Sequence, residues 1–403
     1  MKAKNILSKE EAIKIILHSQ GLSSREKFGS GKEATLNCIR HLGYVQLDTL
    51  AVVARAHHHI IQTRTGSHEE KFLNELIREK KIFEYWSHAA AFLPMEDFRF
   101  SLVRKNDFVK GKAHWFAKDK KMHKYVRDKI KAEGPLQSRD FETDKNHGSW
   151  FDWKPAKIAL EQLFQNGTLM VTERKGFQKV YDLTERVLPA GINSSLPKKD
   201  EFAEYLIRST LRANGIASLK DFTHLRKGMK SAVEKVIKKL LLDGEIIPVS
   251  IIGIDENFYQ FTNCKEIQDS KFRIQNPAAE ILSPFDNLII RRERLKKLFD
   301  YDFMLECYLP EQKRKFGYFC LPVLHENKFI GKFDPKADRA AGIFYVKSFY
   351  LENKPKDMDK FLQSFSFALK EFARFNNCEK IIIEKTFPSK IKSMMDLSLR
   401  NET

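Results

Sequence analysis

The feature that most constrains the fold is an order of helices and strands that occurs twice. In residues 119–184, apolar residues at helical spacing lead into GPLQSRDF, then into the helix-like KPAKIALEQLFQNG and two strand-like stretches around a Lys-Gly turn. Pro155 near the start of the second helix and Gly167 just past its end are typical helix boundary residues. Residues 198–262 repeat the order, with LLLDGEIIPV aligning with LFQNGTLMV. Helices followed by a hairpin predict a winged helix.

The repeat divides the chain into four predicted domains. Residues 1–110 are a degenerate first winged helix, residues 111–195 the second and residues 196–275 the third. From residue 276 to 390 the pattern changes to strands between charged turns, which is typical of a small antiparallel barrel-like domain. The expected fold class is therefore α+β, with three tandem winged helices followed by this domain.

The C-terminal domain is expected to contain five strands, a helix and a closing strand. The predicted strands are ILSPFDNLII, DFMLECYL, GYFCLPVLH, KFIGKFDP and AGIFYVKSFYL, followed by the helix DKFLQSFSFALKEFARF and the strand KIIIEK. Residues 388–403 carry no core pattern and are expected to fray.

The excess of positive charge indicates a polyanionic partner. The chain carries 71 Lys and Arg against 53 Asp and Glu, a net charge of +18 spread along its length. Such an excess favours binding to double-stranded DNA, because basic side chains neutralise phosphates and release counterions. Winged helices also serve as protein-interaction modules, and some proteins are merely basic, so both alternatives remain open.

Cysteine usage and hydropathy indicate a cytoplasmic protein. The five cysteines lie far apart without a CxxC pair, which indicates a reducing compartment and no zinc site. They are Cys38, Cys264, Cys307, Cys320 and Cys378. The sequence has no apolar run of about 18 residues, and its start, MKAKNILSKEEAIKII, alternates charged with apolar residues. We expect a monomer without membrane contact, metal or cofactor.

A carboxamide and a carboxylate interrupt the apolar stretch GYVQLDTL. Alternate side chains of a strand share one face, so Gln46 and Asp48 are expected to project together with Tyr44. For a lone Gln-x-Asp in any sequence, a helix cap or an ion pair with a neighbouring arginine is the default explanation. In a DNA-binding protein, however, the pair suits cleavage of an N-glycosidic bond. The carboxylate stabilises an oxocarbenium-like transition state and orients water, and the carboxamide holds the water or the sugar.

The same pair limits the substrate. Glycoside hydrolysis normally needs a general acid for the leaving group, and a glutamine cannot donate a proton as an acid. A purine alkylated at N7 or N3 is already cationic and leaves without one. The pair Gln46 and Asp48 therefore predicts alkylpurines as substrates.

Further polar residues are candidates for DNA contact. They are Arg55, His57, His58, Arg64, Trp86, His88, Arg174 and Lys175. A metal site is the alternative for the three consecutive histidines, but adjacent residues of an extended segment point to opposite faces and no HExxH spacing occurs. Core packing is the alternative for Trp86, and solubility is the alternative for the basic pair at the hairpin tip.

Several stretches resemble the winged-helix DNA glycosylases of the YcaQ/AlkZ type. They are LGYVQLDTLAVVARAHHHIIQTR, FEYWSHAAAFLP, LSPFDNLIIRRERLKKLF, KRKFGYFCLPVLH and IGKFDPKADR. The resemblance implies three tandem winged helices with a C-terminal β-barrel, and Gln46 and Asp48 as the catalytic pair. Asp at the second position is similar to the YcaQ-like branch, which implies excision of N7-alkylated guanines and unhooking of interstrand crosslinks. Since no lysine lies at the motif, it also implies a monofunctional enzyme.

Two other functions remain open at this point. A non-enzymatic winged-helix regulator would bind one duplex sequence selectively, as a symmetric oligomer. A nuclease would need a carboxylate cluster for magnesium, and none stands out in the sequence.

Overall fold

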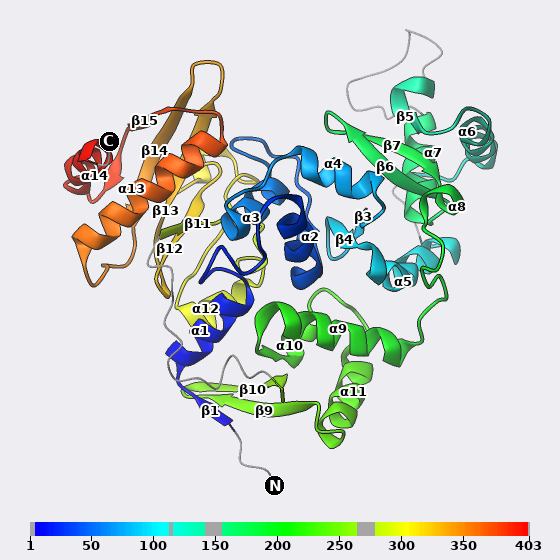
Figure 1. Ribbon diagram of the computed structural model, residues 1–403, viewed down its shortest axis with the longest axis horizontal. Coiled ribbons are helices and arrows are strands. Elements are labelled where there is room, and N and C mark those ends of the chain that lie inside the picture. Colours follow the sequence, from blue (N-terminus) through cyan, green and yellow to red (C-terminus); the bar gives the residue numbers. More distant parts are fainter. Residues whose placement is uncertain (1–4, 113–115, 142–154, 264–278, 402–403) are drawn as a thin grey trace.

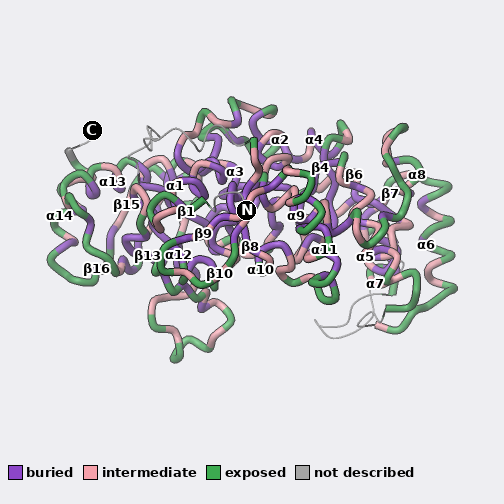
Figure 2. Tube along the Cα trace, turned by 90° about the horizontal axis from the view of Figure 1, so that it is seen from below, coloured by how far each residue is buried: buried purple, intermediate pink, exposed green. Residues whose placement is uncertain are grey.

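The computed structural model describes residues 5–112, 116–141, 155–263 and 279–401, and it has a mixed α+β fold. Figure 1 shows the strand-rich C-terminal part at one end, a helix and hairpin unit at the other, and the remaining units between and below them. In Figure 2 the buried residues run through the middle of an elongated molecule, while exposed residues are frequent at its two ends.

The first unit spans residues 9–109. Its helices are α1 (Lys9–Ser19), α2 (Gly31–Leu42), α3 (Ala56–Thr65), α4 (Lys71–Arg78) and α5 (Phe98–Val109), and its strands are β2 (Val45–Gln46), β3 (Ile82–Trp86) and β4 (Ala90–Pro94). The strands form a sheet in the order β2-β4-β3. A capping box starts α1, in which the Ser8 hydroxyl accepts from the Glu11 amide and the Glu11 carboxylate accepts from the Ser8 amide.

The second unit contains the helix and hairpin that the sequence predicts. Its elements are α6 (Lys120–Glu133), β5 (Leu136–Gln137), α7 (Pro155–Gln165), β6 (Leu169–Lys175), β7 (Gln178–Leu183) and α8 (Thr184–Val187). The strands pair in the order β5-β7-β6. Gly176 makes the turn between β6 and β7 with a φ of +61°, a conformation that favours glycine.

The third unit takes up the N-terminal strand of the chain. It contains α9 (Lys199–Asn214), β8 (Ala217–Ser218), α10 (Leu219–Phe222), α11 (Lys230–Leu242), β9 (Ile246–Ile251) and β10 (Ile254–Phe261). Strand β1 (Asn5–Leu7) pairs in parallel with β9, with Asn5 opposite Val249, in a sheet of order β1-β9-β10-β8. The start of the chain therefore packs with residues more than 200 positions away, as Figure 1 shows.

The C-terminal part is a six-stranded sheet covered by helices. Its strands are β11 (Ala279–Ile281), β12 (Leu321–His325), β13 (Lys328–Asp338), β14 (Ile343–Leu351), β15 (Lys380–Ile383) and β16 (Thr386–Phe387), and its helices are α12 (Arg292–Phe299), α13 (Met358–Phe375) and α14 (Ile391–Asn401). Strands β11 to β14 are antiparallel, but β15 and β16 both pair in parallel with β14. The expectation of a wholly antiparallel domain is therefore wrong.

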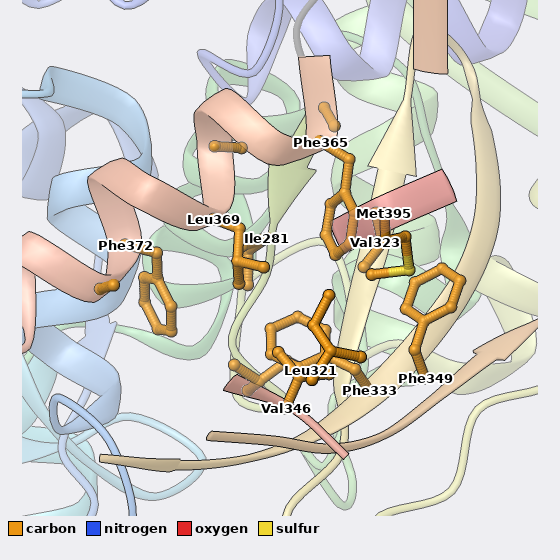
Figure 3. Close-up of a cluster of buried hydrophobic side chains, with 14 of the residues drawn as sticks. Ile281, Leu321, Val323, Phe333, Val346, Phe349, Phe365, Leu369, Phe372 and Met395 are labelled. Atoms are coloured by element: carbon orange, nitrogen blue, oxygen red, sulfur yellow. The ribbon is translucent and has the colours of Figure 1, made fainter. Parts of the chain in front are cut away.

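Figure 3 shows how this sheet is covered. Phe365, Leu369 and Phe372 of α13 point toward the strand residues Leu321, Val323, Phe333, Val346 and Phe349. Met395 of α14 joins the same buried cluster. Residues 391–401 thus form a helix with a buried face, and the expectation of fraying is wrong for them, while residues 402–403 lie outside the described part of the chain.

The predicted strand DFMLECYL is also wrong. Residues 302–309, all of which the structure describes, form a loop without strand pairing. The buried Glu306 carboxylate accepts hydrogen bonds from the backbone amides of Lys315, Phe316 and Gly317. These bonds satisfy amides that a sheet would otherwise pair, and they hold the segment as a loop.

Residues 50–54, which we call the junction segment, join the first unit to the C-terminal sheet. Val53 lies in the buried cluster of that sheet, with Leu50 and Val52 packed against it. The Val52 carbonyl accepts from the Ala337 amide at 3.2 Å, and the Ala54 amide donates to the Asn376 side chain at 2.6 Å. The junction segment begins two residues after Asp48.

The cysteines and the lengths of the helices bear on two further expectations. In the described part of the chain four cysteines are free, Cys38, Cys307, Cys320 and Cys378, whereas Cys264 lies outside it. No helix among the described residues combines the length and apolar character needed to cross a membrane.

Candidate active site

Gln46 is held in place by a histidine from the β3–β4 turn. It pairs with Ala91 of β4, and its side chain is buried with the residue 8% exposed. His88 Nε2 lies 2.9 Å from Gln46 Oε1. Burial lowers the pKa of His88 to about 4, so the ring is neutral at physiological pH. Because Oε1 can only accept, the Nε2–H of His88 donates.

Asp48 lies just beyond the strand. Strand β2 ends at Gln46, so the alternation from which we expected a shared face with Tyr44 does not extend to Asp48. The Asp48 Oδ1 atom accepts from the Leu50 amide at 2.8 Å. Burial raises the pKa of this carboxyl above its ordinary value, against the opposing effect of hydrogen bonds from Leu50 and Thr49.

Asp48 lines a cavity of about 350 Å³, which we call the motif cavity. The first unit contributes Leu47, Asp48, Thr49 and the β3–β4 hairpin, and the second unit contributes α7 and the β6–β7 hairpin. Its aromatic lining residues are Trp86, Phe177 and Tyr181. The Arg104 guanidinium lies 5.0 Å from the centre of the Trp86 ring.

The other two carboxylates of the motif cavity, Glu84 and Glu161, are paired with cations. Arg174 donates to both oxygens of Glu84 at 2.9 and 2.8 Å, and Lys179 lies 3.6 Å from Glu84 and 3.2 Å from Glu161. Burial alone would raise the pKa of Glu84, but the charges of Lys179 and Arg174 outweigh it and hold this pKa below its ordinary value. Within the described part of the chain, Asp48 has no cationic partner at ion-pair distance.

The C-terminal loop reaches the motif as well. Burial raises the pKa of Cys307 and of Tyr308, and the negative charge of Asp48 raises both further, which places the two residues near Asp48. Tyr308 is 75% exposed. Sequence reasoning misses this neighbour because the pattern of DFMLECYL predicts a strand.

The structure corrects the expectation that Arg64 contacts DNA. Arg64 is fully buried, and its guanidinium donates to both oxygens of Asp286 at 2.7 and 2.9 Å. Its Nε atom donates to the Gln20 carbonyl at 2.7 Å. All its donors are used inside the protein, so Arg64 is a structural residue.

The histidines are corrected in the same way. They lie on helix α3 and not on an extended segment, and His57, His58 and His59 are all buried. Burial lowers the pKa of all three, that of His58 to about 3, so they are neutral. His58 and His59 contact His68 and the Ile281 carbonyl, respectively, at 2.9 Å. They pack the interior instead of contacting phosphates.

The remaining candidates differ in their accessibility. Arg174 is half-buried and paired with Glu84, whereas Lys175 is exposed at the hairpin tip. Arg55 is half-buried and lies 4.2 Å from the centre of the Phe177 ring. Trp86 borders the motif cavity and His88 holds Gln46. The role of His88 as partner of Gln46 was not foreseen, because the two residues are 42 positions apart.

Comparison with known proteins now defines the class. The family model described as DNA glycosylase AlkZ-like matches residues 39–375. The chain belongs to this family, and it is therefore a DNA glycosylase, a DNA-binding enzyme of DNA repair. This sets aside the non-enzymatic regulator and the nuclease that the sequence left open.

Among solved structures, the chain is similar to the Streptomyces sahachiroi DNA glycosylase AlkZ. The TM-score is 0.63 at 15% sequence identity, and the match covers 95% of this chain and 100% of that chain. At this identity the likeness concerns the fold.

Proposed function

We propose that the enzyme hydrolyses the N-glycosidic bond of N7-alkylated purines, with Asp48 and Gln46 as its catalytic pair. The observation that carries this proposal is the charge distribution of the motif cavity. Glu84 and Glu161 are paired with cations, whereas Asp48 has no such partner among the described residues. Its charge is therefore free to act on the positive charge that develops on the sugar.

The two side chains have different roles in this mechanism. Asp48 has one oxygen fixed by the Leu50 amide, and its carboxylate stabilises the sugar cation and positions the attacking water. The Gln46 carboxamide oxygen is held by His88, which leaves the amide N–H groups to donate to water or to the sugar. Each role uses a group whose orientation a neighbour already sets.

The cavity favours a leaving base that needs no proton. The lowered pKa of Glu84 keeps that carboxylate ionised at neutral pH, and burial raises the pKa of the Tyr181 hydroxyl. Neither group is then an effective general acid. A purine alkylated at N7 is already cationic, and the face of Trp86 suits a cationic ring.

The enzyme is proposed to be monofunctional. Of the two lysines that line the motif cavity, Lys179 is paired with Glu84 and Glu161. Burial would lower the pKa of Lys179, but the charge of Glu84 outweighs it and holds this pKa above its ordinary value. A protonated amine is a poor nucleophile for a Schiff base with the sugar.

The duplex is proposed to lie on three winged helices, whose hairpins are β3–β4, β6–β7 and β9–β10. Lys175 at the tip of the second hairpin contacts a phosphate in this arrangement, and the half-buried Arg55 lies beside the same hairpin. Because the Gln-x-Asp motif resembles the YcaQ-like branch, we extend the proposal to unhooking of interstrand crosslinks by a monomer.

The test is base release from a duplex with one N7-methylguanine and from one with a nitrogen-mustard crosslink. Asp48→Asn and Gln46→Ala should each lose about 100-fold or more in rate while DNA affinity is kept. Glu161→Gln removes a paired carboxylate from the same cavity and should keep most activity. Wild-type rates in both motif variants would refute the catalytic pair, and strand cleavage coupled to base release would refute the monofunctional assignment.

A further inference from the structure

A second cavity, of about 100 Å³, lies between the first and third units. It is enclosed by the β3–β4 turn, by helices α9 and α10 and by residues 287–294 of the C-terminal part. We call it the arginine cavity, because Arg226, Arg291 and Arg294 all line it. It is distinct from the motif cavity, and His88, the partner of Gln46, borders it.

The three arginines exceed the negative charge around them. Of the residues that line the arginine cavity, all of them described, Asp221 is the one carboxylate. Arg291 lies 3.0 Å and Arg294 3.9 Å from it. The lining histidines do not change this balance, because burial lowers the pKa of both His88 and His224 to about 4 and keeps them neutral.

Arg226 has neutral partners. Its guanidinium donates to the Ser87 carbonyl at 3.1 Å and to the Ser87 hydroxyl at 3.2 Å. In the described part of the chain no carboxylate lies at ion-pair distance from it. Arg226 is half-buried. A guanidinium that is partly removed from water without a counter-charge is unfavourable, and an anion beside it reduces that cost.

Arg294 has an unused donor at the same place. Its Nη1 atom donates to Asn214 at 2.6 Å and its Nη2 atom to the Asn287 carbonyl at 3.3 Å, but its buried Nε atom has no hydrogen-bond partner. The cavity therefore combines an excess of cationic groups with a guanidinium whose hydrogen bonding is incomplete. Guanidinium groups match the oxygens of a phosphate better than those of other small groups.

We propose that the arginine cavity binds a phosphate group. Two sources share this chemistry, a backbone phosphate of the DNA and free inorganic phosphate. The occupant would contact Arg226, which is bonded to Ser87, and Ser87 precedes His88 in the turn that holds Gln46. Phosphate binding does not depend on which base is excised, so a test of this site is independent of a test of the proposed function.

The first arm of the test uses inorganic phosphate and the full chain. The midpoint of thermal unfolding is measured in sodium phosphate and in sodium chloride of equal ionic strength. Phosphate should raise the midpoint of the wild type, and Arg226→Gln should weaken phosphate binding about tenfold. Arg208→Gln, which removes an exposed arginine of α9 paired with Glu204 and Glu245, is the matched control and should behave like the wild type.

The second arm uses DNA duplexes in which one backbone phosphate at a time near the lesion is a neutral methylphosphonate. If the DNA supplies the occupant, one position should weaken wild-type binding about tenfold and leave Arg226→Gln almost unchanged, and phosphate should compete with DNA. If phosphate binds without competing with DNA, the source is free phosphate. A wild type that shows neither phosphate stabilisation nor sensitivity to any methylphosphonate would overturn the proposal, whether or not the variant folds.

Discussion

The Nε2–H of His88 donates to Oε1 of Gln46 across 2.9 Å and thereby ties the turn of the β3–β4 hairpin to strand β2. The Tyr44 ring packs edge-on against the His88 ring, with the ring centres 5.1 Å apart. These two contacts fix which end of the Gln46 carboxamide is available to a ligand. In the proposed mechanism His88 is therefore a positioning residue that acts through Gln46.

Replacing His88 should reduce excision without reducing DNA affinity. In His88→Ala the carboxamide of Gln46 loses its fixed orientation, and we expect base release to fall about 10–100-fold. His123→Ala is the matched control, because His123 Nε2 also contacts a glutamine, at 2.6 Å from Oε1 of Gln162 in the second unit. Single-turnover base release measures both variants, and equal rates in the wild type and His88→Ala would contradict the assignment.

The pH dependence of excision should report the ionisation of Asp48. Burial raises the pKa of this carboxyl, and the proposed mechanism uses its charged form. Single-turnover rates should therefore rise with pH through an inflection above the ordinary aspartate value of about 4. Asp48→Asn should lack this inflection at its low residual rate. A wild-type profile that falls with rising pH over the same range would show that Asp48 is needed as an acid.

Breaking the buried pair of Arg64 and Asp286 should affect stability and not DNA contact. Arg64→Met leaves Asp286 charged and unpaired in the interior, and we expect it to lower the free energy of unfolding by about 3–5 kcal/mol. The double variant Arg64→Met/Asp286→Leu should be more stable than Arg64→Met. Urea unfolding measures the stability of both variants. A change in the salt dependence of DNA binding by folded Arg64→Met would instead show that Arg64 contacts DNA.

Substitutions of Lys175 and Arg174 should distinguish a residue that contacts DNA from one that stabilises the fold. Lys175→Ala removes an exposed cation and should weaken DNA binding evenly across sequences, with the slope of log K against log salt reduced by about 1. Arg174→Ala leaves the buried Glu84 with a weakened charge balance and should lower stability. Fluorescence anisotropy at several salt concentrations gives the slope, and an unchanged slope for Lys175→Ala would exclude its phosphate contact.

Lys105 should make stability depend on pH. It is buried among aromatic rings, 3.9 Å from the centre of the Phe98 ring, and burial lowers its pKa from 10.5 to about 7. Between these two pKa values the unfolded chain binds the extra proton, so stability rises with pH over this range. Lys105→Met should thus stabilise the protein by about 2–4 kcal/mol at pH 6.5, and by less at pH 9.5. Urea unfolding at both pH values tests this, with the exposed Lys110→Met as control; an equal gain at both would contradict it.

Local patterns predicted the elements, and long-range contacts decided their roles. The helix Pro155–Gln165 and the hairpin around Gly176 follow from apolar spacing and a turn residue, which are local signals. Arg64 was assigned to DNA because its partner Asp286 is 222 positions away and no local pattern reveals it. Glu306 likewise holds an apolar stretch as a loop, because its carboxylate accepts hydrogen bonds from backbone amides 9–11 residues later.

The apolar signal of the last helix was present in the sequence. Ile391, Met395 and Leu399 follow one another at intervals of four residues, which places them on one face of a helix. The first two are buried and Leu399 packs against the same cluster. Charged and polar residues between them hid the pattern. The sequence reveals the candidate catalytic pair because it interrupts an apolar stretch, but its surroundings come from segments distant in the chain.

Val53 inserts into the core of the C-terminal sheet. Two parts of the chain, the first unit and the C-terminal part, therefore hold the segment that carries the motif. A fragment that ends before residue 276 would keep Gln46 and Asp48 in its sequence, yet it would lose the surface against which residues 50–54 rest. The placement of the segment that follows Asp48 thus depends on contacts as distant as that between Ala54 and Asn376, 322 positions apart. During synthesis on the ribosome, residues 50–54 would lack their partner surface until the last sheet has formed around that valine.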